Sequence, residues 1–322
     1  MLGVKQTTLI TLYCTVCDNH SIIEERMQRL SNNRFPKFSD EECITAYLWG
    51  KLEGRSMRKD VYNFIRDYWH GWFPKLPSYQ AFCRRLNNLV PAFQALAEIW
   101  SGMLCAQFEE SVQYIIDSCP IILAKQSRSG SAKVAKDFCD KSYNSSRQEY
   151  YYGVKLHSLV IRRAGSLPVA ETLMLSKASV FDLTAAKMMF LNTPPARRGW
   201  LLADKAYCDS EWADTLRTEH GIKIVTPRRQ KKGDTLKSGD AYSTAVSLCR
   251  QPIESFFNWI NSKFHIQTAS FVRSSTGLLF HVFANIAAAM LFKLFNSWFA
   301  LYIWIIHQSN WNCQWIWKIL LK

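Results

Sequence analysis

An aspartate interrupts the most strand-like stretch of the sequence, QYIIDSCPII at residues 113–122. Residues 114–116 form an apolar β-run, Asp117 follows directly, and the apolar pattern resumes at Pro120. A buried carboxylate without a partner costs several kcal/mol, which is comparable to the stability of a whole domain. The fold must therefore supply this acid with a basic side chain, a set of backbone donors or a metal ion.

The composition predicts a globular, basic protein. The 322 residues are 48% hydrophobic, which excludes a disordered chain and allows two or three domains with their own cores. Forty Lys and Arg against 26 Asp and Glu leave a net charge of +14, so a polyanionic partner is expected, with nucleic acid ahead of an anionic membrane. The ten cysteines lack a compact framework and predict reduced thiols in a cytosolic protein.

One cysteine spacing stands apart from the others. The stretch CTVCDNH places Cys14, Cys17 and His20 three residues apart, as zinc ligands could be. A structural zinc site needs a fourth ligand, however, and the sequence has no second pair at such a spacing. Two half-buried helix cysteines are the favoured interpretation, and a zinc site remains the alternative.

Helices are predicted for residues 1–110. A capping-box pattern at residues 39–42 precedes one apolar helical stripe, and Ser78 is placed to cap another helix. On this second helix Arg84 and Arg85 are expected to face outward. A basic helix of this kind could lie in a DNA groove, or it could simply have a solvated basic face.

The hydrophobic period changes to that of strands near residue 111. Two β-rich runs around residues 164–166 predict a hairpin, and the polar residues 125–149 before it predict a loop. Strands and helices then alternate up to about residue 290. This order predicts an α/β fold in which helices flank a mixed sheet.

The C-terminal third is strongly apolar from Met290 to Ile306, although Lys293 and Asn296 interrupt the run. The uninterrupted part is shorter than the ~20 residues that a membrane span needs. A core helix followed by an apolar tail is therefore favoured, with a membrane anchor as the alternative. The N-terminus lacks a signal-like cleavage site, so no export is expected.

Three acids are candidates for one site. Asp117 follows the run YII and Asp204 follows the run LLA, each where a strand is expected to reach its carboxyl end, the edge at which open α/β sheets bind ligands. Glu254 lies near the start of a helix. Carboxylates gathered together repel one another unless a divalent cation neutralises them, and Mg²⁺ prefers such oxygen ligands. Taken singly, each acid could instead be a turn residue or a partner of a helix dipole.

A family resemblance joins these acids. The strings YIIDSCPI, YYGVKLH, LLADKAY and QPIESFFNWIN resemble, in order and spacing, the catalytic blocks of bacterial insertion-sequence transposases of the DDE type, over roughly residues 111–290. The resemblance implies an RNase H-like core in which Asp117, Asp204 and Glu254 are the catalytic, metal-binding triad. It also implies Mg²⁺ as cofactor, with Mn²⁺ possible, and two-metal phosphoryl transfer that cuts and joins strands at element ends.

The same resemblance assigns DNA-binding roles to basic residues. Arg250 lies four residues before Glu254, as in related transposases. Those proteins often have a Lys seven residues after the Glu, but this chain has Asn261 there, and Lys263 is the nearest substitute. Lys205 and a basic run after the last strand would hold phosphates without reading sequence. That run contains Arg228, Arg229, Lys231 and Lys232. His157, in VKLHS, could touch the site, but a histidine that faces the core is the favoured interpretation.

The chain is thus expected to be a DNA transposase in three parts. Residues 1–110 would be a helical region that helps to bind element ends, residues 111–290 the catalytic domain, and residues 291–322 an apolar tail of unclear role. The expected partners are double-stranded DNA, both element ends and target, and a second copy in a homodimer, with no membrane. The expected location is cytoplasmic and nucleoid-associated. A catalytically inactive DNA-binding protein derived from a transposase is the alternative.

Overall fold

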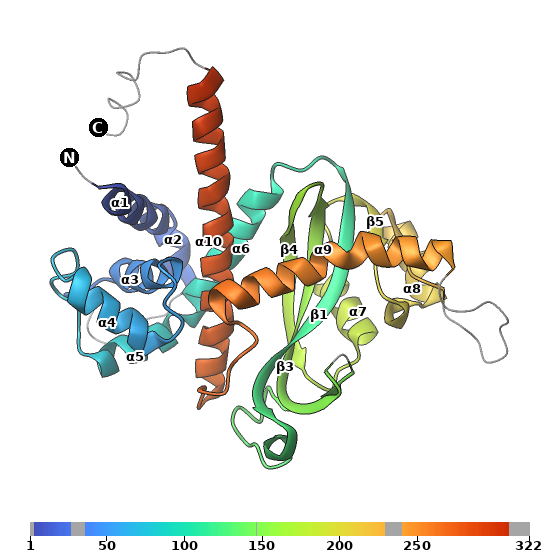
Figure 1. The fold of residues 1–322 in the computed structure, drawn as a ribbon, viewed down its shortest axis with the longest axis horizontal. Coiled ribbons are helices and arrows are strands. Elements are labelled where there is room, and N and C mark those ends of the chain that lie inside the picture. The colour runs from blue at the N-terminus through green and yellow to red at the C-terminus, as the bar shows by residue number, and fades with distance from the viewer. Residues whose placement is uncertain (1–2, 27–35, 146, 229–239, 309–322) are drawn as a thin grey trace.

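Helices form the N-terminal third of the chain, as predicted (Figure 1). The computed structural model describes residues 3–26, 36–145, 147–228 and 240–308, except for the side chains of His20 and residues 297–308. Within this part, six helices precede the first strand. They are α1 (Val4–Cys17), α2 (His20–Arg26), α3 (Asp40–Leu52), α4 (Arg58–Tyr68), α5 (Tyr79–Asn88) and α6 (Val90–Cys105).

The predicted helix starts are confirmed. Ser39 Oγ accepts from the Glu42 amide at 3.1 Å while Glu42 accepts from the Ser39 amide, which is the reciprocal capping box. Ser78 accepts from the amide of Ala81 at the start of α5. The prediction that Arg85 faces outward is wrong. It turns toward α3, where it pairs at 2.5 Å with Asp40, the first residue of that helix.

A mixed six-stranded sheet follows the helices. Its order is β2-β3-β1-β5-β6, with β4 also paired to β3. The ladders among β1 to β4 are antiparallel, whereas β5 runs parallel to both β1 and β6. The strands are β1 (Ser111–Lys125), β2 (Asp140–Asn144), β3 (Glu149–Arg163), β4 (Ser166–Lys177), β5 (Arg198–Leu202) and β6 (Ile222–Val225).

Helices cover both faces of this sheet. Adjacent residues of a strand point to opposite faces. Asp117 meets α9 (Ala241–Phe264) on one face, while Ser118 meets α7 (Asp182–Asn192) on the other. A further helix, α8 (Ser210–Glu219), joins β5 to β6. The predicted fold class is confirmed: an RNase H-like mixed sheet flanked by helices and preceded by an all-α region.

The segment predicted as a loop at residues 125–149 contains regular structure. It forms a short 3₁₀ turn at Gln126–Ser129 and the strand β2, which extends the sheet beside β3. Next to it, Gly153 of β3 faces β1 so closely that a Cβ there would lie 2.0 Å from the carbonyl oxygen of Ile121. The register of β1 shifts just beyond this contact, between Ile122 and Ala124.

The last helix, α10 (Ser275–Gln308), lies between the N-terminal helices and the sheet (Figure 1). The segment Ser275–Asn296 is long and apolar enough to cross a membrane, but 72% of its apolar window is buried inside the protein. This burial agrees with the predicted core helix as far as Asn296, and the side chains of the rest of the predicted run lie outside the described residues. The expected boundary at 290/291 falls within α10, and Leu291, Leu294 and Phe295 are buried.

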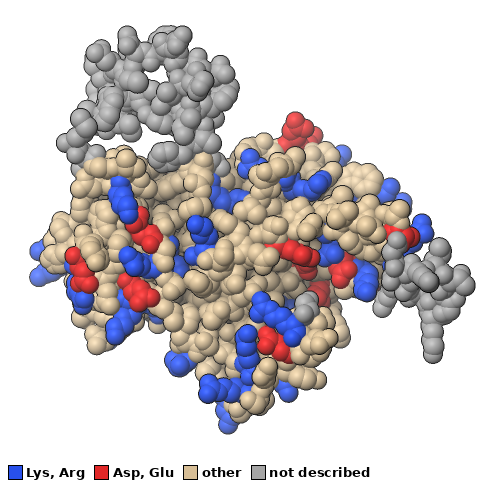
Figure 2. Space-filling model, in the orientation of Figure 1, with Lys and Arg blue, Asp and Glu red and all other residues tan. Residues whose placement is uncertain are grey.

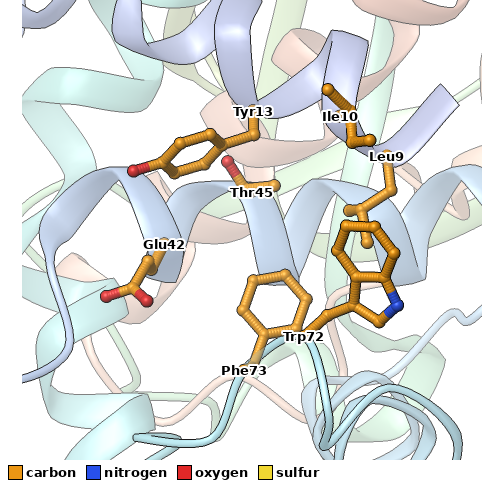
Figure 3. A pocket seen from close by; sticks show the side chains of 7 residues that line it. All are labelled: Leu9, Ile10, Tyr13, Glu42, Thr45, Trp72 and Phe73. Carbon is orange, nitrogen blue, oxygen red and sulfur yellow. The ribbon is translucent and has the colours of Figure 1, made fainter. Parts of the chain in front are cut away.

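A separate hollow lies among the N-terminal helices. It has a volume of about 220 Å³ and lies between α1, α3 and the turn at residues 72–73 (Figure 3). Its lining is mainly apolar and aromatic, with the carboxylate of Glu42 at one side. The lining contains none of the three candidate acids of the catalytic site. The residues are Leu9, Ile10, Tyr13, Glu42, Thr45, Trp72 and Phe73.

Two lysines, one buried and one half-buried, tie segments of the core together. Lys51 of α3 donates to the carbonyls of Ser56 and Phe264, the latter at the end of α9. Lys293 of α10 donates to the carbonyls of Leu167 and Pro168 in β4. Burial lowers the pKa of each lysine from 10.5 to about 8.

Replacing Lys51 by Met should therefore change how stability depends on pH. The pKa of Lys51 is lower in the folded state, so the unfolded state binds more protons between pH 8 and 10.5. The contribution of this group to the free energy of unfolding therefore increases as the pH rises through that window. The stability of the wild type relative to Lys51→Met should rise across that window, as measured by urea unfolding. The exposed control Lys59→Met should differ from the wild type by the same free energy of unfolding at every pH in this window. A parallel pH profile for wild type and Lys51→Met would contradict the prediction.

Candidate active site

Asp117 lies in the middle of β1. The prediction that it ends a strand is wrong, because β1 continues to Lys125 through its ladder with β3. The parallel ladder with β5, however, runs only as far as Ile115 opposite Leu202. Asp117 is thus two residues beyond the last pair on β1, as Asp204 is on β5. The register of the two parallel strands brings both acids to the same level, where β5 leaves the sheet.

Arg250 of α9 faces both aspartates. Its guanidinium lies 3.2 Å from Asp117 Oδ2 and 3.7 Å from Asp204 Oδ1. The arginine side chain is 13% exposed, against 27% for Asp117 and 43% for Asp204. Each carboxylate also accepts a backbone bond, from the amides of Ser118 and Lys205 respectively. The charged partner of Asp117 in this structure is therefore Arg250.

Arginine does not fully compensate the burial of Asp117. Burial raises the pKa of Asp117 to about 6, although the Ser118 amide and Arg250 both act in the opposite direction. The hydroxyl of Tyr207, close to these charges, is buried without a hydrogen-bond partner among the described residues. Asp117 therefore remains short of positive charge. Together with the carboxylate of Asp204 and the hydroxyl of Tyr207, it offers only oxygen donors, which suits a divalent cation.

The third candidate acid is not gathered with the other two. Glu254 lies one turn after Arg250 on α9 and is exposed. Among the described residues, no group of three or more His, Cys, Asp or Glu side chains is placed to hold a metal ion together. The structure therefore brings Asp117 and Asp204 to one point and leaves Glu254 apart from them.

The basic candidates are dispersed. Lys205 is exposed directly after Asp204. Lys263 lies over the ring of Phe292 at 5.6 Å, and Asn261 accepts from the Gln267 amide, so this end of α9 is occupied by structural contacts. Arg84 is exposed on α5, and Arg228 pairs with Asp240 at 3.0 Å. The predicted contacts at Arg229, Lys231 and Lys232 lie outside the described residues.

One charged neighbour of Asp117 was missed in the sequence. Asp182, at the start of α7, accepts from Ser118 Oγ at 2.9 Å and from Lys155 Nζ at 3.0 Å. It raises the pKa of Asp117 more than Asp204 does. No spacing marks it in the sequence, because its place depends on the α7 packing. His157, predicted to face the core, is 1% exposed, and burial lowers its pKa to about 4.

The cysteine spacing remains open. Cys14 is exposed and Cys17 half-buried on α1. The side chain of His20 lies outside the described residues, so the zinc alternative stays a prediction. The thiol of Cys17 has a raised pKa because of its burial, which disfavours the thiolate that binds zinc.

Fold and site together define a class of protein. A basic chain with an RNase H-like sheet, and with two carboxylates aimed at one point beside an arginine, has the elements of a phosphoryl-transfer enzyme of nucleic acids. The family model of the transposase DDE domain matches residues 111–291, over half of the chain. The chain belongs to this family. It is a DNA transposase of the DDE type, and enzymes of this family use divalent metal ions.

The chain has a distant likeness to several solved complexes of the Mos1 transposase. The Mos1 strand transfer complex is 14% identical, with a TM-score of 0.22, and the paired-end complex with the left transposon end is 14% identical, with a TM-score of 0.24. The mariner paired-end complex with Mn is 15% identical, with a TM-score of 0.23. Each comparison covers 90% of this chain and 98% of the other. No curated protein matches the chain.

Metal affinity should depend on pH through Asp117. A proton on this carboxylate competes with the metal, and with a pKa of about 6 the group is mostly protonated at pH 5. Affinity for Mn²⁺ should therefore be about tenfold weaker at pH 5 than at pH 7.5, since one pKa unit corresponds to a factor of ten. Electron paramagnetic resonance of free Mn²⁺ measures it. Equal affinity at both pH values would remove Asp117 from the metal site.

Proposed function

We propose that Asp117, Asp204 and Glu254 form the active site of an insertion-sequence transposase that cuts and joins DNA strands at element ends. The observation that carries this proposal is the convergence of Asp117 and Asp204 on Arg250 at the sheet edge. Glu254 lies one helical turn from Arg250, so a modest rotation of its side chain or of α9 on binding DNA would bring it toward the pair.

Asp117 and Asp204 would hold the divalent cation, which we propose to be Mg²⁺, with Mn²⁺ as a substitute. Both ions prefer carboxylate and water oxygens, and carboxylates are what this edge of the sheet offers. When bound, such ions activate the attacking oxygen and stabilise the leaving oxygen of a phosphodiester. The backbone bonds from Ser118 and Lys205 would orient the two carboxylates for this role.

Arg250 would bind a phosphate of the substrate. Its guanidinium already lies within 4 Å of both carboxylates, so a phosphate placed over the aspartates would meet it directly. The planar fork of arginine suits bidentate contact with phosphate. Lys205, exposed beside Asp204, would add a second positive charge to the same edge.

The rest of the chain would bind and position DNA. The net charge of +14 supports a DNA partner, and the helices before residue 110 are the proposed element-end binding region, with Arg84 exposed on one of them. We propose that residues 111–290 act as the catalytic domain, that two copies form a homodimer on paired ends, and that the protein works in the cytoplasm at the nucleoid without a membrane. Burial of most of the apolar window in Ser275–Asn296 supports the last point.

A second candidate function is a catalytically inactive DNA-binding protein. Two observations favour it: Glu254 is apart from the aspartates, and Asn261, at the position where related transposases have a Lys, accepts from the amide of Gln267 just after α9. The two candidates differ in metal-dependent strand cleavage.

Replacing Asp117 by Asn should separate catalysis from binding. The amide keeps the shape of the side chain but loses the charge that would hold a metal ion, so nicking of element-end DNA should fall by about two orders of magnitude or more. Binding without metal should be retained or rise slightly, because a negative charge facing phosphates is removed. Nicking on a sequencing gel and binding by fluorescence anisotropy measure the two effects.

The matched control is Asp214→Asn, which makes the same change at an exposed position on α8. It should nick and bind as the wild type does. Glu254→Gln tests the third acid in the same assays, and a loss of nicking like that of Asp117→Asn would support its place in the triad. A wild-type protein that binds element ends but never nicks them in Mg²⁺ or Mn²⁺ would favour the inactive candidate.

Salt should weaken DNA binding steeply. Affinity for duplex DNA should fall by ~0.9 log unit per log unit of salt for each phosphate contacted, because bound cations are released from the DNA. Titrations of a labelled duplex between low and physiological salt give the slope. An affinity that stays flat over this range would contradict a largely electrostatic interface.

A further inference from the structure

The segment between β1 and β3 forms a surface that the proposed active site does not use. We call it the hairpin surface and define it by Arg128, Lys133, Lys136, Lys141, Tyr143 and Tyr150. All six side chains are exposed, and the two tyrosines are 49% and 53% exposed. Lys and Arg gather at the lower tip of the molecule, where β1, β3 and their connection lie (Figure 2).

The two tyrosines form a pair across strands. Tyr143 lies opposite Tyr150 in the ladder of β2 and β3, with ring centroids 5.0 Å apart and planes at 58°. Lys141 Nζ lies 4.6 Å from the centroid of Tyr150. Such a pair stabilises a hairpin, and a lysine on an edge strand discourages pairing with other chains. Neither role requires two large rings to stay half exposed beside a lysine.

The acids of this segment are already engaged, whereas most of its cations face solvent. Asp137 accepts from Ser275 Oγ at 2.6 Å and Asp140 from the Ser179 amide at 2.9 Å. Glu149, 12% exposed, lies 3.5 Å from Lys125. Residues 125–149 contain six Lys and Arg against these three acids. The surface therefore offers positive charge beside exposed aromatic faces.

We propose that the hairpin surface binds an unpaired DNA strand, with Tyr143 and Tyr150 stacking on bases and the neighbouring cations contacting phosphates. Aromatic faces combined with a basic surface are how proteins hold single strands without reading their sequence. The surface shares strand β3 with the active site. Ser158 lies opposite Asp117, and it is eight residues after Tyr150 on the same face of β3. At ~3.3 Å per residue, the two positions are ~26 Å apart. The inference rests on the proposed strand-cutting function, because a cut strand can unpair from its end and extend along this face of β3.

Fluorescence anisotropy with a labelled oligothymidine and a duplex of equal length tests the proposal. Tyr143→Thr/Tyr150→Thr keeps strand-forming residues but removes both rings, and it should bind the oligothymidine about tenfold more weakly or worse, with duplex affinity changed by less than about twofold. Tyr143→Phe/Tyr150→Phe keeps the rings and should bind both DNAs as the wild type does. Trp200→Thr, at an exposed ring of β5 beside Lys223, is the control and should change neither.

A second measurement needs no variant. A single strand that contains 5-bromodeoxyuridine should crosslink to the wild-type protein on irradiation, with the crosslinks mapped to peptides that hold Tyr143 or Tyr150. Crosslinks found only elsewhere, unchanged oligothymidine binding by the Thr variant, or equal loss on both DNAs would each overturn the proposal. Nicking by the wild type is scored separately, so active nicking without hairpin crosslinks refutes this inference alone, and crosslinks without nicking refute the proposed function alone.

Discussion

Covering the apolar surface of α10 is the constraint on which the rest of the fold depends. Ala287, Ala288 and Ala289 are fully buried, and the buried positions continue through Leu294. A helix that is apolar on all sides must be enclosed on all sides. The N-terminal helices supply one side and the sheet with α9 the other, so a single hydrophobic cluster runs from α1 to α10.

That shared core also determines where the site forms. Lys51 of α3 holds the last turn of α9 through the Phe264 carbonyl, and Phe256 and Ile260 bury the inner face of the same helix. With α9 held at this end, Arg250 three to four turns earlier is aimed at Asp117 and Asp204. The N-terminal helices thus contribute to the site without contacting it.

Much of this could be predicted from residues alone, where local chemistry decides the outcome. The capping box at residues 39–42 and the hairpin turn with Gly165 at φ 65° are local, and both are as predicted. Asp204 followed its strand as expected. Asp117 does not end its strand as expected, because β1 accommodates Pro120 opposite Lys155 and continues along its ladder with β3.

What escaped prediction depends on long-range packing. β2 is a polar edge strand whose register comes from β3 rather than from its own alternation. The inward turn of Arg85 depends on Asp40, 45 residues away. The separation of Glu254 from the aspartates depends on the rotation of α9 about its axis, which no spacing in the sequence specifies.

The pleat of β1 limits how such chains can diverge. Asp117 and Ser118 point to opposite faces, one toward Arg250 and the other toward Asp182. One residue gained or lost earlier in the strand would exchange these neighbours and turn the carboxylate toward α7. Beyond Ile122 the ladder already tolerates a register shift. Copies of this gene should therefore carry insertions and deletions on the far side of Ile122, while the length from Ser111 to Asp117 stays constant.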